Sequence, residues 1–171
     1  ALTPLHHPCQ ALADLMTLRE RFGELDGLRL AYVGDGNNVA RSLALLAPAV
    51  GVRVVASSPP GFELEAEAGA ELVSDPREAV ADADAVYADV WFSMSDEGVA
   101  MESKREALGP YRVDEALMDA ASDRAVALHC LPAHPGEEIT AEVLYGERSA
   151  VFDQAENRLH AQKALLEMLI G

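Results

Sequence analysis

Imidazole rings, thiols and amides are concentrated in two short segments of this chain, residues 7–10 (HPCQ) and residues 129–132 (HCLP). Such groups can bind a small polar substrate, orient it and exchange protons with it. Two further polar segments, residues 34–38 (GDGNN) and 89–95 (DVWFSMS), each follow an apolar run. Four polar clusters at the ends of apolar runs indicate one shared site.

Cys130 is the candidate for covalent chemistry, because a thiol beside a histidine can act as a nucleophile. Neighbouring residues on a strand point to opposite faces, however, so His129 is poorly placed to take the proton of Cys130. We therefore expect the thiol to line a pocket. Asp89, at the end of an expected strand, can hold the ammonium group of a substrate. Arg158 by itself indicates no more than a surface residue or an ion pair.

Two other kinds of site fit the residues less well. Residues 34–38 invite comparison with a dinucleotide-binding fingerprint, but Val39 replaces the third glycine and no acidic residue closes the next strand. The two asparagines can instead cap a helix or offer donors to a carboxylate. The histidines and cysteines at residues 6–9 and 129–134 match no zinc finger or ribbon. We expect no metal and no organic cofactor.

The clusters need helices and strands to position them. Pro8 suits the first turn of a helix, and apolar residues at helical spacing follow it. We expect helices at residues 8–22, after the turn at 34 to about 47, at 63–68, 76–81 and 113–121, from about 137 and from 154. Asp153 and Glu156 have the spacing of a capping box for the last of them. We expect strands at residues 28–33, 52–56, 71–73, 85–90, 125–129 and 150–152.

Strands that alternate with helices predict a parallel sheet with helices on both faces. We therefore predict a single α/β domain over residues 1–171, with a Rossmann-like, three-layer architecture. In such sheets ligands bind outside the carboxyl ends of the strands. The polar clusters at residues 35–38, 89–95, 129–134 and 153–158 all fall there, which favours a real site over chance.

Composition excludes several classes of partner. The formal net charge of −16 over 171 residues argues against nucleic acid and against anionic membranes. No apolar run approaches the roughly 20 residues of a membrane helix. Two cysteines within polar motifs make no disulfide framework, so a reducing, cytoplasmic setting is expected. The chain begins within a few residues of an expected helix, which we interpret as a cut from a longer protein.

Five motifs together resemble ornithine carbamoyltransferase. In chain order they are HPCQ with LADL at residues 7–15, GDGNN at 34–38, DVW with SM at 89–94, HCLPAH at 129–134 and ENR at 156–158. The resemblance spans the whole chain but covers only the second half of the family's sequence, which is its ornithine-binding domain with two connecting helices. It implies that the side-chain amine of ornithine attacks carbamoyl phosphate to give citrulline and phosphate.

The resemblance also implies roles for individual residues. Asn38 would bind the ornithine carboxylate. Asp89 and Ser93 would hold the α-ammonium group, and Met94 would line the same pocket. Cys130 would lie beside the reacting amine.

A second set of residues would contact carbamoyl phosphate. The resemblance places His7, Gln10 and Arg158 there, together with Cys130 and the backbone carbonyl of Leu131. His7 and Arg158 would stabilise the charge that develops on the carbamoyl oxygen, and with Cys130 they form the implied catalytic set. No metal takes part.

The family's first half carries a phosphate-binding motif and most of the trimer contacts, and neither is in this chain. We therefore expect a homotrimer in the full-length protein, cytoplasmic and active in arginine biosynthesis or the ornithine/citrulline pathway, and little or no activity of the isolated chain. Pro4, Ser95 and Pro135 depart from the family pattern. A non-catalytic amino-acid-binding module on the same scaffold remains an alternative, as does a carbamoyltransferase acting on putrescine or an acylated ornithine.

Overall fold

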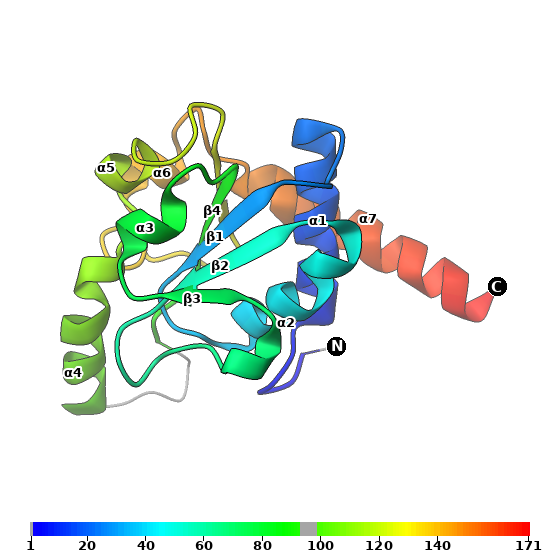
Figure 1. Cartoon of the computed structure of the whole chain (residues 1–171). Coiled ribbons are helices and arrows are strands. Elements are labelled where there is room, and N and C mark those ends of the chain that lie inside the picture. Colours follow the sequence, from blue (N-terminus) through cyan, green and yellow to red (C-terminus); the bar gives the residue numbers. More distant parts are fainter. Residues whose placement is uncertain (1, 93–98) are drawn as a thin grey trace.

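A parallel five-stranded sheet forms the centre of the molecule, in the order β3-β2-β1-β4-β5 (Figure 1). The computed structural model describes residues 2–92 and 99–171. The strands are β1 (Arg29–Val33), β2 (Arg53–Ser57), β3 (Glu71–Val73), β4 (Ala85–Ala88) and β5 (Val126–His129). The chain builds outward from β1 in one direction and then returns to add β4 and β5 on its other side. The strand order therefore reverses between β1 and β4, where α/β sheets form their binding crevice.

Helices cover both faces of the sheet, as predicted. The α-helices are α1 (Pro8–Phe22), α2 (Asn38–Leu46), α3 (Pro76–Val80), α4 (Val99–Leu108), α5 (Glu115–Met118), α6 (Ala141–Leu144) and α7 (Val151–Ile170). Short 3-10 turns lie at Ala47–Val50, Ala66–Ala68 and Gly109–Tyr111. Helices α1, α2 and α7 lie on one side of the sheet, and α3, α5 and α6 lie on the other (Figure 1).

Successive side chains of each strand point to opposite faces of the sheet, so the interior consists of two hydrophobic cores. Leu30 and Tyr32 of β1 pack with α1 and α2, whereas Ala31 and Val33 pack with α3 and α5. Tyr32 stacks on Tyr87, its register partner in β4, with ring centroids 5.5 Å apart. Both faces of these strands are buried, which explains their nearly continuous apolar sequences. The three-layer α/β prediction is confirmed.

The strand expected at residues 150–152 is wrong. Helix α7 begins at Val151, and Ala150 instead donates one backbone hydrogen bond to Ala127 of β5, at 2.9 Å. A short apolar run does not distinguish a strand from the buried first turn of a helix. The capping box at Asp153 and Glu156 is wrong for the same reason, because both residues lie inside the helix.

Other helices are shorter than expected. Residues 63–68 form only the 3-10 turn Ala66–Ala68, because the start of this segment packs against the turn after β1. The N–H of Gly36 donates to the carbonyl of Phe62 at 2.8 Å, and a Cβ on Gly36 would lie 2.3 Å from the backbone nitrogen of Leu64. The helices expected at 113–121 and from about 137 shrink to α5 and α6, and α4 was not expected at all.

Helices α1 and α7, from opposite ends of the described chain, pack against each other. Asn157 of α7 donates to Thr17 of α1 at 3.0 Å, and both side chains are buried. The last turns of α7 extend past the sheet (Figure 1), where Met168 and Ile170 are exposed. Of the helices that the structure describes, none is long and apolar enough to cross a membrane.

Candidate active site

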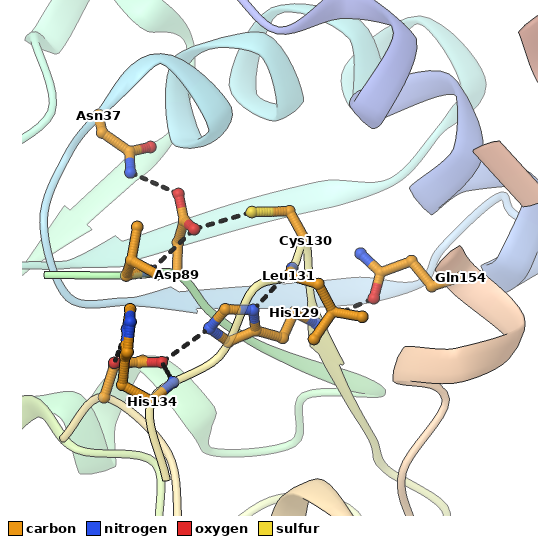
Figure 2. Close-up of polar contacts among 9 residues, drawn as sticks. Asn37, Asp89, His129, Cys130, Leu131, His134 and Gln154 are labelled. Atoms are coloured by element: carbon orange, nitrogen blue, oxygen red, sulfur yellow. Dashed lines mark hydrogen bonds and ion pairs between the residues drawn. The ribbon is translucent and has the colours of Figure 1, made fainter. Parts of the chain in front are cut away.

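Asp89 is the centre of a polar cluster at the carboxyl ends of β1, β4 and β5 (Figure 2). It directly follows β4 and is 4% exposed. The amide of Asn37 donates to its Oδ2 at 2.6 Å, and the thiol of Cys130 donates to its Oδ1 at 2.8 Å. Three strands that end at one edge of the sheet therefore bring together an amide, a carboxylate and a thiol from distant parts of the sequence.

Asn37 is held in place by its role as the N-cap of α2. Its Oδ1 accepts hydrogen bonds from the backbone N–H groups of Val39 and Ala40 and from the hydroxyl of Tyr32, at 3.0 Å. Because these bonds fix Oδ1, the NH2 group of Asn37 must point toward Asp89. Asn37 was not among the predicted site residues, but the sequence analysis expected the two asparagines to cap a helix or to offer donors to a carboxylate, and Asn37 does both.

Asn38, the residue predicted to bind a substrate carboxylate, lies in the first turn of α2. Its amide donates to the backbone carbonyl of Thr3 at 2.8 Å. With Asn37, Asn38 lines a small hollow of about 110 Å³ whose other walls include Arg41 and Glu65. Its contact with a substrate remains a prediction.

Cys130 is a protonated thiol. Burial raises its pKa well above the usual range, and the adjacent Asp89 carboxylate raises it further. A thiol that donates to a carboxylate is a poor nucleophile, because the thiolate is the reactive form. The geometry therefore agrees with a thiol that orients neighbouring groups rather than one that attacks a substrate.

The segment after β5 is held by a buried histidine. Nδ1 of His129 accepts the backbone N–H of Leu131 at 2.9 Å, so the ring proton lies on Nε2 and donates to Oε1 of Glu138 at 3.1 Å (Figure 2). Glu138 Oε1 also accepts the N–H of His134 at 2.5 Å. These bonds support a backbone turn in which Leu131 has φ +57°, a conformation that side chains disfavour. Glu138 was not predicted.

A second polar cluster lies between α1 and α7. Arg158 donates through Nη1 to Oε1 of Gln10 at 2.6 Å. Burial lowers the pKa of His7, and the Arg158 charge lowers it further, so this imidazole is neutral at neutral pH. Asp89 acts in the opposite direction on the same ring. His7 therefore lies within electrostatic reach of both a cation and an anion.

Two buried nitrogen atoms at this cluster have no hydrogen-bond partner among the described residues. They are Nδ1 of His7 and Nε of Arg158. Buried polar atoms are rarely left unpaired in folded proteins. His7 is the N-cap of α1 and Arg158 lies on α7, so both unpaired atoms are enclosed by the protein beside the contact between Gln10 and Arg158.

The site residues do not suit a metal ion. Ligand atoms of Asp89, His129 and Cys130 come within 4.8 Å of one another. Both ring nitrogens of His129 are already used, by Leu131 and Glu138. The raised pKa of Cys130 also disfavours the thiolate that a metal requires.

Comparison with known proteins decides the family. The family model described as "Aspartate/ornithine carbamoyltransferase, Asp/Orn binding domain" matches residues 26–169. The chain belongs to the aspartate/ornithine carbamoyltransferase family.

Individual members of the family resemble the chain along its whole length. It is 52% identical to the ornithine carbamoyltransferase of Acidothermus cellulolyticus and 53% identical to that of Parasynechococcus marenigrum, with 99% and 100% of this chain covered. The crystal structure of ornithine carbamoyltransferase from Thermus thermophilus superimposes with a TM-score of 0.91 at 46% identity and covers 100% of this chain. The chain spans only 58%, 57% and 58% of these three proteins.

The predicted resemblance to ornithine carbamoyltransferase is confirmed, and so is the fold class. Of the residues that this carbamoyltransferase resemblance singled out, the structure brings Asp89 into contact with Cys130, and Gln10 into contact with Arg158. Ser93 and Met94 lie outside the described residues. The role of each residue in the site remains a prediction.

Proposed function

We propose that the protein to which this chain belongs transfers the carbamoyl group of carbamoyl phosphate to the side-chain amine of ornithine, forming citrulline and phosphate. The observation that carries the proposal is the separation of charge across the site. A buried carboxylate, Asp89, lies at the end of β4, and a guanidinium, Arg158, lies on α7, with His7 within reach of both. An amino acid with an ammonium group and a phosphate-bearing co-substrate need these two charges.

The reaction joins the amine nitrogen to the carbamoyl carbon and breaks the bond from that carbon to the phosphate oxygen. Phosphate leaves with the electron pair of the broken bond, and the amine loses a proton. The amine must be uncharged to attack, which a site poor in water favours. Neutral His7 and cationic Arg158 are donors for the oxygen that becomes negative in the transition state.

The substrate residues are assigned as follows. Asp89 holds the ammonium group of ornithine together with Ser93, Asn38 binds its carboxylate, and Met94 lines the same space. His7, Gln10, Arg158 and the Leu131 carbonyl contact carbamoyl phosphate, with Cys130 beside the reacting amine. The assignment follows the motifs that this chain shares with ornithine carbamoyltransferases, and relatives of that name match 99% and 100% of the chain.

The remainder of the relatives' length implies a further part of the protein. We propose that residues 1–171 are the ornithine-binding domain and its connecting helices, and that a second domain supplies most of the phosphate contacts. The proposal extends to a homotrimer in the cytoplasm, with a role in arginine biosynthesis or the ornithine/citrulline pathway.

The test uses the natural full-length protein that contains this chain. Purified protein is incubated with carbamoyl phosphate and ornithine, and citrulline and phosphate are measured together. Putrescine and N-acetylornithine are assayed in parallel. We expect citrulline and phosphate in equal amounts from ornithine and much lower rates with the other two amines.

Variants and the isolated chain sharpen the test. Asp89→Asn should raise the KM for ornithine, whereas Arg158→Met should raise the KM for carbamoyl phosphate. The 171-residue chain alone should form little citrulline, and adding the missing domain should increase the rate. Absence of citrulline from the full-length protein would refute the transferase function, and faster turnover of putrescine or N-acetylornithine would refute the substrate.

A further inference from the structure

Asp14 is a fully buried carboxyl group on α1, far in sequence from the polar clusters at the strand ends. Burial raises its pKa to about 7, although hydrogen bonds from Gln10, Gln154 and Tyr87 and the charge of Arg158 act against this rise. Burying such a group costs free energy unless partners compensate. Its hydrogen bonds therefore indicate what the group does.

Two glutamine side chains donate to the same oxygen of Asp14. Gln10 Nε2 lies 2.8 Å from Oδ1, and Gln154 Nε2 lies 2.6 Å from it. A proton bound to the carboxyl group can reside on Oδ2, which accepts no hydrogen bond from the described residues. Oδ1 can thus accept in either charge state, and each glutamine must turn its NH2 group toward it.

The other end of each amide points toward the candidate site. The carbonyl oxygen of Gln10 accepts from Arg158 at 2.6 Å. The carbonyl oxygen of Gln154 accepts the backbone N–H of His129 at 2.9 Å (Figure 2). If either amide were flipped, its NH2 group would face another donor. Asp14 at one end and the two donors at the other end therefore fix the direction of both amides. The NH2 group of Gln154 also donates to the hydroxyl of Tyr87 at 3.1 Å, whereas Asp14 is the acceptor for the NH2 group of Gln10.

We propose that Asp14 is a positioning residue that fixes the amide orientation of Gln10 and Gln154. Through Gln10 it aims the guanidinium of Arg158, and through Gln154 it anchors the start of the segment that carries Cys130. The proposal rests on the function proposed above, and it assigns a role to a residue that touches neither substrate.

Two substitutions at Asp14 separate positioning from simple packing. Asp14→Asn retains an acceptor oxygen at Oδ1 and can place its NH2 group at the Oδ2 position. Asp14→Leu keeps a side chain branched at Cγ, although a larger one, and removes the acceptor. Thr17→Val is the matched control, because Thr17 also lies on α1 and is as buried as Asp14. Its hydroxyl accepts a hydrogen bond from Asn157 of α7, and this bond involves neither Gln10 nor Arg158.

Steady-state kinetics of the natural full-length protein give the readout. We expect Asp14→Leu to raise the KM for carbamoyl phosphate about tenfold or more and Asp14→Asn to raise it less than about threefold. Thr17→Val should lower the Tm and change this KM less than about twofold. Equal effects of the two Asp14 substitutions, or the same KM increase in Thr17→Val, would overturn the proposal.

A reciprocal exchange tests the amide orientation and does not depend on Asp14→Leu folding. Gln10→Glu places two carboxyl groups against each other and should raise the KM for carbamoyl phosphate. Combining it with Asp14→Asn supplies a donor opposite the new carboxylate and should lower that KM again by about threefold or more. Failure of this rescue would also overturn the proposal.

Failure of the function and failure of the positioning role give different results. If the unaltered protein forms no citrulline, the proposed function is wrong, and crystal structures then decide the role of Asp14. The bond from Arg158 to Gln10 should persist in Asp14→Asn and be lost in Asp14→Leu, where nothing holds the NH2 group of Gln10 away from Arg158. An unchanged Arg158 in Asp14→Leu would refute the positioning role.

Discussion

The amide of Asn37 donates to Oδ2 of Asp89 at 2.6 Å, and the two residues lie 52 positions apart in the sequence. This bond couples the N-cap of α2 to the end of β4. It also means that Asp89 is oriented before any substrate arrives, because its other oxygen accepts the thiol of Cys130. A substrate ammonium group would meet a carboxylate whose direction is already fixed.

Substitution of Asn37 should lower stability in two ways, by removing the cap of α2 and by removing the acceptor of the Tyr32 hydroxyl. Asn37→Ala removes the cap of α2 and leaves the Tyr32 hydroxyl without its acceptor, so we expect the free energy of unfolding to fall by about 2 kcal/mol. Asn37→Ser keeps a capping oxygen and should recover about 1 kcal/mol of this loss. Urea unfolding followed by circular dichroism measures both. Equal stability of the two variants would contradict the capping role.

Cys130 should be slow to alkylate. Burial and the neighbouring Asp89 raise its pKa, so little thiolate is present at pH 8, and we expect iodoacetamide to react at least about 100-fold more slowly than with an exposed cysteine. Asp89→Asn removes the negative charge and should speed the reaction. Mass spectrometry of the peptide containing Cys130 follows this residue separately from Cys9. Rapid labelling of the unaltered protein would show that the thiol is ionised.

The pH dependence of stability should contain a contribution from Asp14. Its pKa is raised from 3.8 to about 7 in the folded protein, so the folded state binds more protons than the unfolded state between these values. The free energy of unfolding contributed by this group is therefore largest below pH 4 and decreases as the pH rises to about 7, by up to about 1.4 kcal/mol per pH unit.

Asp14→Asn supplies the comparison for this pH effect, because asparagine does not titrate. Urea unfolding of both proteins at pH 5, 6, 7 and 8 should show that the variant gains stability relative to the unaltered protein up to about pH 7. Above that pH the difference should become constant. Parallel stability profiles across the whole range would mean that Asp14 does not take up a proton on folding.

Glu138 should stabilise the segment after β5 through the two donors that it accepts. Glu138→Ala leaves the buried Nε2 proton of His129 and the partly buried N–H of His134 unpaired, and we expect the free energy of unfolding to fall by about 3 kcal/mol. Glu138→Gln keeps one acceptor oxygen and should lose about 1 kcal/mol. Thermal unfolding of both variants measures the difference. If glutamine destabilised as much as alanine, the charge rather than the acceptor would be responsible.

The location of the site could be predicted from sequence more reliably than its contacts. Asp89 and Cys130 were expected to lie together because parallel strands place their carboxyl ends at one edge of the sheet, a rule that needs no side-chain detail. The contact between Gln10 and Arg158 was not derivable in that way. It depends on how α1 packs against α7, across 148 positions of sequence.

The errors have a physical explanation in competition between local and tertiary interactions. Residues 63–68 have a helical composition, but the backbone of Glu63 and Leu64 packs against Gly36 instead. The apolar run at residues 150–152 is compatible with either a strand or the start of a helix. In the fold Ala150 bonds to β5 and the helix begins at Val151. Asp14 and Gln154 carry no local motif for their contact, so only the folded structure reveals them.

The pairing of α1 with α7 has a consequence for protein synthesis. Gln10 and Asp14 leave the ribosome among the first residues of this segment, whereas Gln154 and Arg158 are among the last. The sheet and most of both cores can form on the nascent chain before α7 has emerged. The contacts of Gln154 and Arg158 cannot, so during translation the scaffold precedes the complete set of site contacts by the time needed to make α7.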